Sequence, residues 1–210
     1  MTTLLLCRHG RTDWNDDGRY QGRADVPLNP LGHQQADRLA QDLRERHLDA
    51  VYSSALQRGV QTAQRIAARH GLQVVTDARL NEIDQGLWEG LLVTEIALSY
   101  PELFQRWQTA PLEVRLPEGE TVHEVAIRAL VALGEIVGRH PWSTVCVVSH
   151  RMLMLCLLWA LEGFDLASAA RDLPANGQIV ELRTSVDAVA AALARITQLS
   201  DERLMGAPAD

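Results

Sequence analysis

The chain has 210 residues, a length that suits one well-buried domain spanning residues 1–210. Its shares of hydrophobic (47%) and charged (22%) residues are typical of a folded globular protein and exclude a disordered one. The formal net charge of −7 disfavours a general binder of nucleic acid or of anionic membranes, so we expect neither partner.

The cellular location of the protein is predicted from the absence of membrane and export patterns in the sequence and from its cysteines. No apolar run approaches the ~20 residues that a bilayer span needs, and the N-terminus lacks the pattern of an export signal. Cys7, Cys146 and Cys156 lie in apolar stretches without metal or disulfide spacing, which favours small buried side chains in a reducing compartment. We therefore expect a cytoplasmic protein.

Strand-like and helical patterns alternate along the chain. Strands are predicted at residues 3–7, 49–54, 72–76 and 143–150. Three apolar helix faces lie between them: Leu31, Ala36, Leu39, Ala40 and Leu43 after Asn29-Pro30; Ala63, Ile66, Ala67 and His70 before Gly71; and Val122, Val125, Ala126, Ala129, Leu130, Leu133 and Val137. This alternation predicts an α/β sandwich around a mostly parallel sheet.

The last quarter of the chain is less regular. Residues 151–163 have a helical pattern, and residues 178–183 suit an edge strand. Residues 188–196 have helical propensity but fit a strand as well, so both alternatives stay open.

Basic residues follow three of the predicted strands. Arg8 and His9 end the first strand, His150 ends the strand at 143–150, and Arg58 lies in the first turn of the helix after residues 49–54. In open α/β sheets, ligands bind outside the carboxyl ends of the strands. Because the chain contains no lysine, any fixed cation there is arginine or histidine, and arginine suits bidentate binding of phosphate.

Six sequence blocks extend this pattern. They are RHGRTDWN from Arg8, GRYQGRADVPLNPLGHQQA from Gly18, YSSALQRGVQTA from Tyr52, LNEIDQGLWEG from Leu80, PEGET from Pro117 and VCVVSH from Val145. Together they resemble the histidine phosphatase superfamily, in the branch shared with cofactor-dependent phosphoglycerate mutases, over about residues 4–182. The resemblance implies a three-layer α/β/α sandwich and phosphoryl transfer through a phosphohistidine.

The resemblance also implies roles for individual residues. His9 matches the nucleophile, Glu82 the proton donor, and Arg8, Arg58 and His150 the other positions of the phosphate pocket. Asn15, Gln21 and Gly22 match positions that help to hold phosphate or substrate.

General chemistry agrees with these roles. The transition state of phosphoryl transfer spreads negative charge over three oxygens, which two arginines and a second histidine can stabilise. A neutral imidazole is a competent nucleophile when a backbone carbonyl holds the proton on its other nitrogen. A partly desolvated carboxyl such as Glu82 can protonate the leaving group and later accept a proton from water.

Other interpretations of these residues remain open. Asp84 and Glu89 are rivals of Glu82 for the proton donor, and Asn15 and Gln21 could both be turn-forming residues. The other histidines and most tryptophans are expected to be structural: His33, His47, His70, His123 and His140 as surface residues, and Trp88, Trp107, Trp142 and Trp159 as packing residues.

We expect no metal and no cofactor. Two histidines could bind zinc, but Arg8 and Arg58 would repel a cation, and the sequence offers no paired cysteines, HxxxH pair or carboxylate cluster to complete a site.

The position after His150 departs from the family pattern, which usually has glycine there. Arg151 places a bulky cation at the mouth of the pocket or turns it outward on the helix. Our hypothesis is that Arg151 contacts the substrate.

The sequence favours a phosphatase over a mutase. Mutases of the family carry a long insertion with extra basic residues between the acid and the PEGET block, whereas residues 82–120 here are short and contain only Arg106 and Arg115 as cations. Residues of about 85–120 are predicted to form a cap over the site. We predict a metal-independent phosphomonoesterase that acts on a small phosphorylated metabolite, and a homodimer is one assembly open to it. The alternative functions are a phosphoglycerate mutase and a catalytically silent module that binds a phosphorylated ligand.

Overall fold

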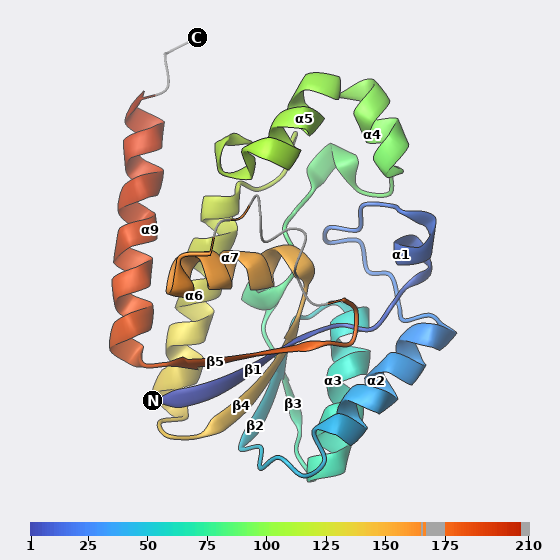
Figure 1. Ribbon diagram of the computed structural model, residues 1–210, viewed down its shortest axis with the longest axis vertical. Coiled ribbons are helices and arrows are strands. Elements are labelled where there is room, and N and C mark those ends of the chain that lie inside the picture. Colours follow the sequence, from blue (N-terminus) through green and yellow to red (C-terminus); the bar gives the residue numbers. More distant parts are fainter. Residues whose placement is uncertain (165, 167–174, 207–210) are drawn as a thin grey trace.

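A five-stranded sheet forms the centre of the computed structural model, which describes residues 1–164, 166 and 175–206 (Figure 1). Its strands are β1 (Thr2–Arg8), β2 (Ala50–Ser53), β3 (Val74–Thr76), β4 (Thr144–Ser149) and β5 (Ile179–Thr184). The strand order is β3-β2-β4-β1-β5, with β5 antiparallel to β1 and the other pairs parallel. The predicted α/β sandwich with a mostly parallel sheet is therefore confirmed.

Helices α2 (Pro30–Asp42) and α3 (Gln57–His70) cover one face of the sheet (Figure 1). The side chain of Asn29 caps the first turn of α2, and Gly71 ends α3 with a left-handed φ of 66°. Their apolar faces pack in one buried cluster with Leu5 and Cys7 of β1 and residues of β4.

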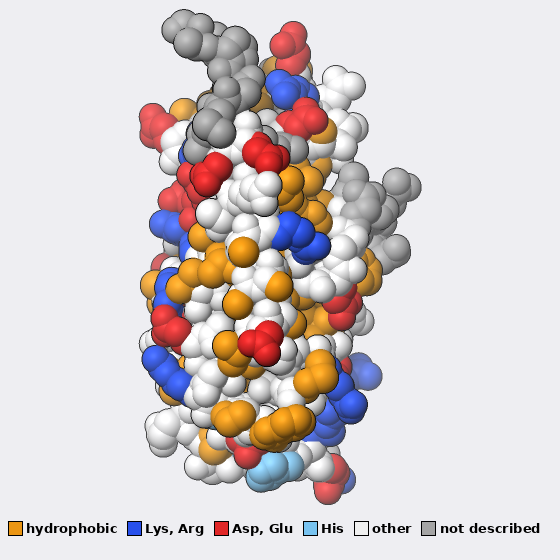
Figure 2. Space-filling view, turned by 90° about the vertical axis from the view of Figure 1, so that its left-hand side faces the viewer, with side chains coloured by type: hydrophobic (Ala, Val, Ile, Leu, Met, Phe, Trp, Pro, Cys, Tyr) orange, Lys and Arg blue, Asp and Glu red, His pale blue; other side chains and the backbone are white. Residues whose placement is uncertain are grey.

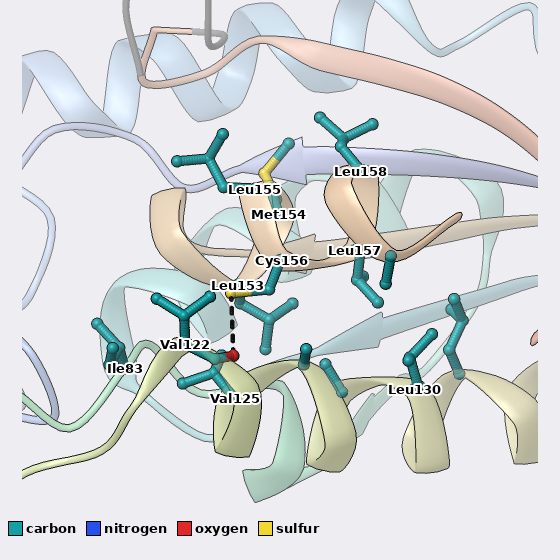
Figure 3. Close-up of a cluster of buried hydrophobic side chains, with 14 of the residues drawn as sticks. Ile83, Val122, Val125, Leu130, Leu153, Met154, Leu155, Cys156, Leu157 and Leu158 are labelled. Atoms are coloured by element: carbon teal, nitrogen blue, oxygen red, sulfur yellow. Dashed lines mark hydrogen bonds between the residues drawn. The ribbon is translucent and has the colours of Figure 1, made fainter. Parts of the chain in front are cut away.

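Helices α6 (Val122–Arg139), α7 (Arg151–Glu162) and α9 (Val186–Gly206) lie on the other face (Figure 1). Their apolar side chains interlock in a second buried cluster, in which the Cys156 thiol lies 3.8 Å from the carbonyl oxygen of Val122 (Figure 3). Residues 188–196 belong to α9 and are helical. The two helix layers complete the three-layer sandwich.

Shorter elements lie between these strands and helices in the chain. They are α1 (Asp13–Asp17), η1 (Ala78–Leu80), η2 (Gly86–Trp88), α4 (Val93–Ser99), α5 (Pro101–Thr109) and η3 (Pro111–Glu113). Trp88 is fully buried and contacts Tyr20, Phe104 and Trp107 at ring-centroid distances of 5.8, 5.9 and 6.3 Å. These edge-to-face contacts attach α5 to the loop that follows α1.

Three sequence-based expectations about packing are wrong. His123 was expected at the surface, but it is buried edge-on to Trp159, with 5.4 Å between the ring centroids. Trp142 was expected to pack, but it is 84% exposed in the turn before β4. Leu31 was expected on the apolar face of α2, but it is 46% exposed, because the buried side of the helix is formed by Gly32, Ala36, Leu39 and Ala40.

The three cysteines are buried and free, as predicted. The fold also brings the sulfur atoms of Cys7 and Cys146 to 3.6 Å, a contact between β1 and β4 that the sequence spacing does not indicate. This contact, followed by burial, raises the pKa of the Cys7 thiol, so Cys7 stays protonated.

The outer surface mixes side chains of different kinds. On the face where α9 lies, hydrophobic, acidic and basic side chains alternate (Figure 2), and Val186 and Leu199 of α9 are among the exposed apolar residues. Among the helices of residues 1–164, 166 and 175–206, none has the length and apolar character to cross a bilayer.

Candidate active site

The parallel pairing of β1 and β4 places two histidines together. Arg8 lies opposite Ser149 in the register, so His9 and His150, 141 residues apart in sequence, follow adjacent strand ends. Their ring centroids are 5.0 Å apart, with the planes tilted by 52°. Two of the predicted site residues therefore meet at the carboxyl edge of the sheet.

His9 is held as a neutral imidazole. Its Nδ1 lies 2.6 Å from the carbonyl oxygen of Gly10, and because a carbonyl only accepts, the proton must be on Nδ1. Burial, with added repulsion from Arg58 and Arg8, lowers the pKa of His9 well below 6.5. The lone pair is therefore on Nε2, as a nucleophile requires.

His150 is fully buried and bonded on both sides of its ring. Nε of Arg58 donates to Nδ1 of His150 over 3.3 Å, and Nε2 lies 2.8 Å from the hydroxyl of Ser54. Since a guanidinium only donates, the neutral tautomer carries its proton on Nε2 and donates it to Ser54. Burial, followed by Arg58 and His9, lowers the pKa of His150 well below 6.5.

Arg58 lies at the start of α3 and is 1% exposed. Besides its bond to His150, it donates to the carbonyl oxygens of Gly22 and Ala24, both at 2.7 Å. Burial lowers its pKa to about 10, so the side chain remains a cation at neutral pH. Arg58 therefore supplies positive charge and also holds the 22–24 loop in place.

A second pair of cations flanks the site. Burial, with repulsion from Arg151, lowers the pKa of Arg8 to about 10, and Glu82 partly offsets this. Arg151 is the first residue of α7 and is exposed. It lies at the mouth of the cavity, not turned away from it.

Glu82 is anchored by backbone amides. Its Oε1 accepts from Ile83 at 2.9 Å and from Met152 at 3.1 Å, and its Oε2 is 3.3 Å from the Met152 nitrogen. The amide of Met152, in the first turn of α7, thus binds the Glu82 carboxyl. Asp84, one of the rival acids, interacts with Arg23 over 3.3 Å and is not among the described cavity residues.

Asn15, Gln21 and Gly22 come from the chain around and after α1. Asn15 caps that helix by accepting from the Thr12 amide at 3.2 Å, and it also lines the cavity. Gln21 is 8% exposed and lines the cavity with an Oε1 that has no protein partner. Gly22 has a φ of 50°, and a Cβ there would lie 2.1 Å from an oxygen of Glu89.

A cavity of about 540 Å³ joins these residues. Arg8, His9, Arg58 and Glu82 line it together with Asn15, Gln21, Gly22 and Arg151. Val93, Phe104, Trp107, Gln108 and Pro111 from residues 85–120 also line it, beside Met152, Leu155 and Leu166. His150 is not among the described residues that line the cavity; it contacts the cavity through His9 and Arg58.

Several lining or supporting residues were not singled out by sequence reasoning. Arg19, Tyr20 and Gln85 line the cavity, and Ser54 bonds to His150. Gln85 is 7% exposed, and its Oε1 has no protein partner. A signal was present for Ser54, because it is the last residue of the predicted strand at 49–54 and shares the YSSALQR block with Arg58.

The positive charge of the site is supplied by arginine side chains. Within the part of the chain that the structure describes, no three His, Cys, Asp or Glu side chains form a cluster that could hold a metal ion. Arg8, Arg58 and His9 line the same cavity.

Comparison with known proteins decides the family. The chain matches the family model of the histidine phosphatase superfamily (branch 1) over residues 4–197. The chain belongs to this superfamily. It is a phosphatase of the superfamily, in agreement with the three-layer fold and with the cationic edge around His9.

Individual relatives cover most of the chain. Phosphoserine phosphatase 1 of Hydrogenobacter thermophilus is 44% identical over 167 residues, which are 80% of this chain and 79% of the relative. A probable phosphoglycerate mutase of Yersinia pestis is 36% identical over 78% of this chain and 76% of the relative. Among solved structures, a mycobacterial glucosyl-3-phosphoglycerate phosphatase superposes with a TM-score of 0.81, at 30% identity, over 89% of this chain and 93% of that one.

Proposed function

We propose that the protein hydrolyses small phosphate monoesters without a metal ion, through a phosphohistidine at His9. The observation that carries this proposal is the bond from Nδ1 of His9 to the Gly10 carbonyl, beside the buried Arg58 and the partly buried Arg8. It leaves the Nε2 lone pair next to cations that attract a phosphate dianion.

The first step transfers the phosphoryl group to the protein. Nε2 of His9 forms a bond to phosphorus while the bond from phosphorus to the ester oxygen breaks. The departing oxygen takes its proton from the carboxyl of Glu82, whose position is fixed by the amides of Ile83 and Met152. Arg8 and Arg58 neutralise the phosphoryl oxygens, and His150 keeps Arg58 oriented.

The second step releases phosphate. A water molecule attacks phosphorus, the bond from phosphorus to Nε2 breaks, and its electron pair returns to the imidazole. The Glu82 carboxylate accepts the proton of the water, which restores the starting state. Inorganic phosphate then leaves the cavity.

Hydrolysis is favoured over mutase chemistry by the positions of two arginines. Arg106 and Arg115, the cations of residues 85–120, interact with Glu113 over 3.5 Å and with Glu124 over 2.6 Å, and neither is among the described cavity residues. The segment therefore contributes apolar and amide side chains to the cavity, as a cap over a phosphatase site would. Incubation with 3-phosphoglycerate and a bisphosphoglycerate primer tests this, because isomerisation faster than phosphate release would favour a mutase.

The substrate proposed is a small phosphorylated metabolite that carries a carboxylate. The relatives are named for phosphoserine and glucosyl-3-phosphoglycerate, and the cavity has Arg19 and Arg151 in addition to the two inner arginines. A cytoplasmic location and a homodimer belong to the proposal too. Light scattering on the purified protein measures the assembly state, and a monomer would rule out the dimer.

The deciding experiment assays a panel of phosphate esters with excess chelator, for the wild type and for His9→Ala. We expect full turnover by the chelated wild type and a loss of at least about 10³-fold in the variant. Quenching with acid is unsuitable because phosphohistidine is acid-labile. The intermediate is therefore trapped in alkali and identified by mass spectrometry. Activity that vanishes with chelator and returns with magnesium or zinc would overturn the metal-independent mechanism.

A further inference from the structure

Arg128 lies on α6, outside the cavity, and its side chain is 15% exposed. Each of its donor groups is used. Nε donates to Oε1 of Glu120 at 2.8 Å and Nη2 to Oε2 at 2.9 Å, which is a two-point ion pair. The remaining N–H groups point at the backbone of the segment that carries Glu82.

Three carbonyl groups of that segment accept from Arg128. Nη1 donates to the carbonyl oxygens of Arg79 at 2.7 Å and Asn81 at 2.8 Å, and Nη2 donates to that of Glu82 itself at 2.9 Å. These bonds occupy the planar donors of one guanidinium, an arrangement that an ammonium group cannot reproduce.

Glu120 holds the other end of the segment. Its Oε2 accepts from the amide of Asp84 at 2.9 Å, and its own amide donates to the Asp84 carbonyl at 2.9 Å. The pair of Arg128 and Glu120 therefore fixes residues 79–84 on both sides of Glu82. The Glu82 carboxyl is in turn bonded to α7 through Met152.

We propose that Arg128 is a positioning residue for Glu82, and that it sets how well the enzyme protonates a poor leaving group. The inference rests on the proposed function, in which Glu82 is the proton donor. A displaced carboxyl slows only those substrates whose leaving oxygen needs a proton. Arg128 therefore affects alkyl phosphates strongly and aryl phosphates with an acidic leaving group weakly.

The test measures kcat/KM for two substrates on the same protein sample, because kcat/KM reports the step in which the leaving group departs. p-Nitrophenyl phosphate has a good leaving group, and glycerol 2-phosphate has a poor one. We expect Arg128→Lys to raise the aryl-to-alkyl ratio about 10-fold or more, and Glu82→Gln to raise it by about 10²-fold or more. A reduced amount of folded protein lowers both rates equally and cancels in the ratio.

Arg115→Lys is the matched control. Arg115 also bridges a backbone carbonyl, that of Gly119 at 3.1 Å, and a carboxylate, that of Glu124 at 2.6 Å, but it does not contact residues 79–84. We expect this variant to keep the wild-type ratio. If Arg128→Lys kept the wild-type ratio while Glu82→Gln raised it, the positioning role would be refuted. If Glu82→Gln also left the ratio unchanged, or the wild type hydrolysed neither ester, the proposed function itself would fail.

Discussion

Arg58 and His150, from α3 and from the end of β4, share a hydrogen bond in which Nε donates to Nδ1 over 3.3 Å. One guanidinium therefore orients the second histidine and, through Gly22 and Ala24, holds a loop of the cavity wall. The same cation therefore contributes positive charge to the site and fixes the position of part of the cavity wall.

Replacing Arg58 should move the pKa of both histidines. Repulsion from Arg58 lowers the pKa of His9 and His150, second only to burial, so Arg58→Gln removes a cause of the shift and raises both values. NMR titration of the imidazole protons measures this, with Arg115→Gln as the control. We also expect kcat/KM to fall by about 10²-fold or more. Unchanged titration curves would contradict the electrostatic role.

The two histidines should make stability depend on pH. Their pKa is lowered in the folded protein, so between that value and 6.5 the unfolded chain binds more protons. The free energy of unfolding therefore falls as the pH drops below about 6.5. Urea unfolding at about pH 7.5 and about pH 5 measures the loss. His150→Gln should lose less stability over this interval than the wild type, and an equal loss would refute the assignment.

Arg151 should discriminate between substrates by charge. It lies at the cavity mouth, close enough to Arg8 to lower the pKa of that residue, so a substrate carboxylate placed there would offset the repulsion. For Arg151→Gly we expect kcat/KM for phosphoserine to fall about 10-fold and that for phosphoethanolamine, which lacks the carboxylate, to stay unchanged. Equal effects on both substrates would show that Arg151 does not contact the carboxylate.

Gly22→Ala should damage stability and activity together. The φ of 50° is unfavourable for alanine, and the new Cβ would meet the Glu89 side chain, so we expect a loss of about 1–3 kcal/mol in the free energy of unfolding. The Gly22 carbonyl accepts from Arg58, so turnover should also decrease. Gly18→Ala separates the two causes, because Gly18 has a φ of 73° but open space around its Cβ position. This control should lose stability and keep its turnover.

The sequence predicted what depends on local pattern. Apolar runs and helix faces located the strands and the main helices, and the rule that ligands lie at strand carboxyl ends singled out His9 and His150 before any resemblance was considered. Side-chain periodicity could not reveal Arg128, since its bonds reach backbone carbonyls 46 to 49 residues away. The best local signal was its place beside the buried face of α6, next to Ala129.

The wrong expectations about burial also arise from contacts between distant parts of the chain. His123 and Trp142 were judged by residue type, but burial is decided by which neighbours the fold supplies. The ring of His123 packs edge-on against Trp159 of α7, whereas the side chain of Trp142, in the turn before β4, is exposed to solvent. The ambiguous residues 188–196 became helical because they cover α6, a contact between segments about 60 residues apart.

The placement of β1 has a consequence for biosynthesis. This first strand is paired on one side with β4 and on the other with β5, which lie between residues 144 and 184. The residues of β1 are therefore synthesised well before residues 144–184, which supply both of their neighbouring strands. Such distant pairing slows folding, and a nascent chain that ends before β4 cannot bring His150 beside His9, so enzymatic turnover should appear only after residue 150 has been synthesised.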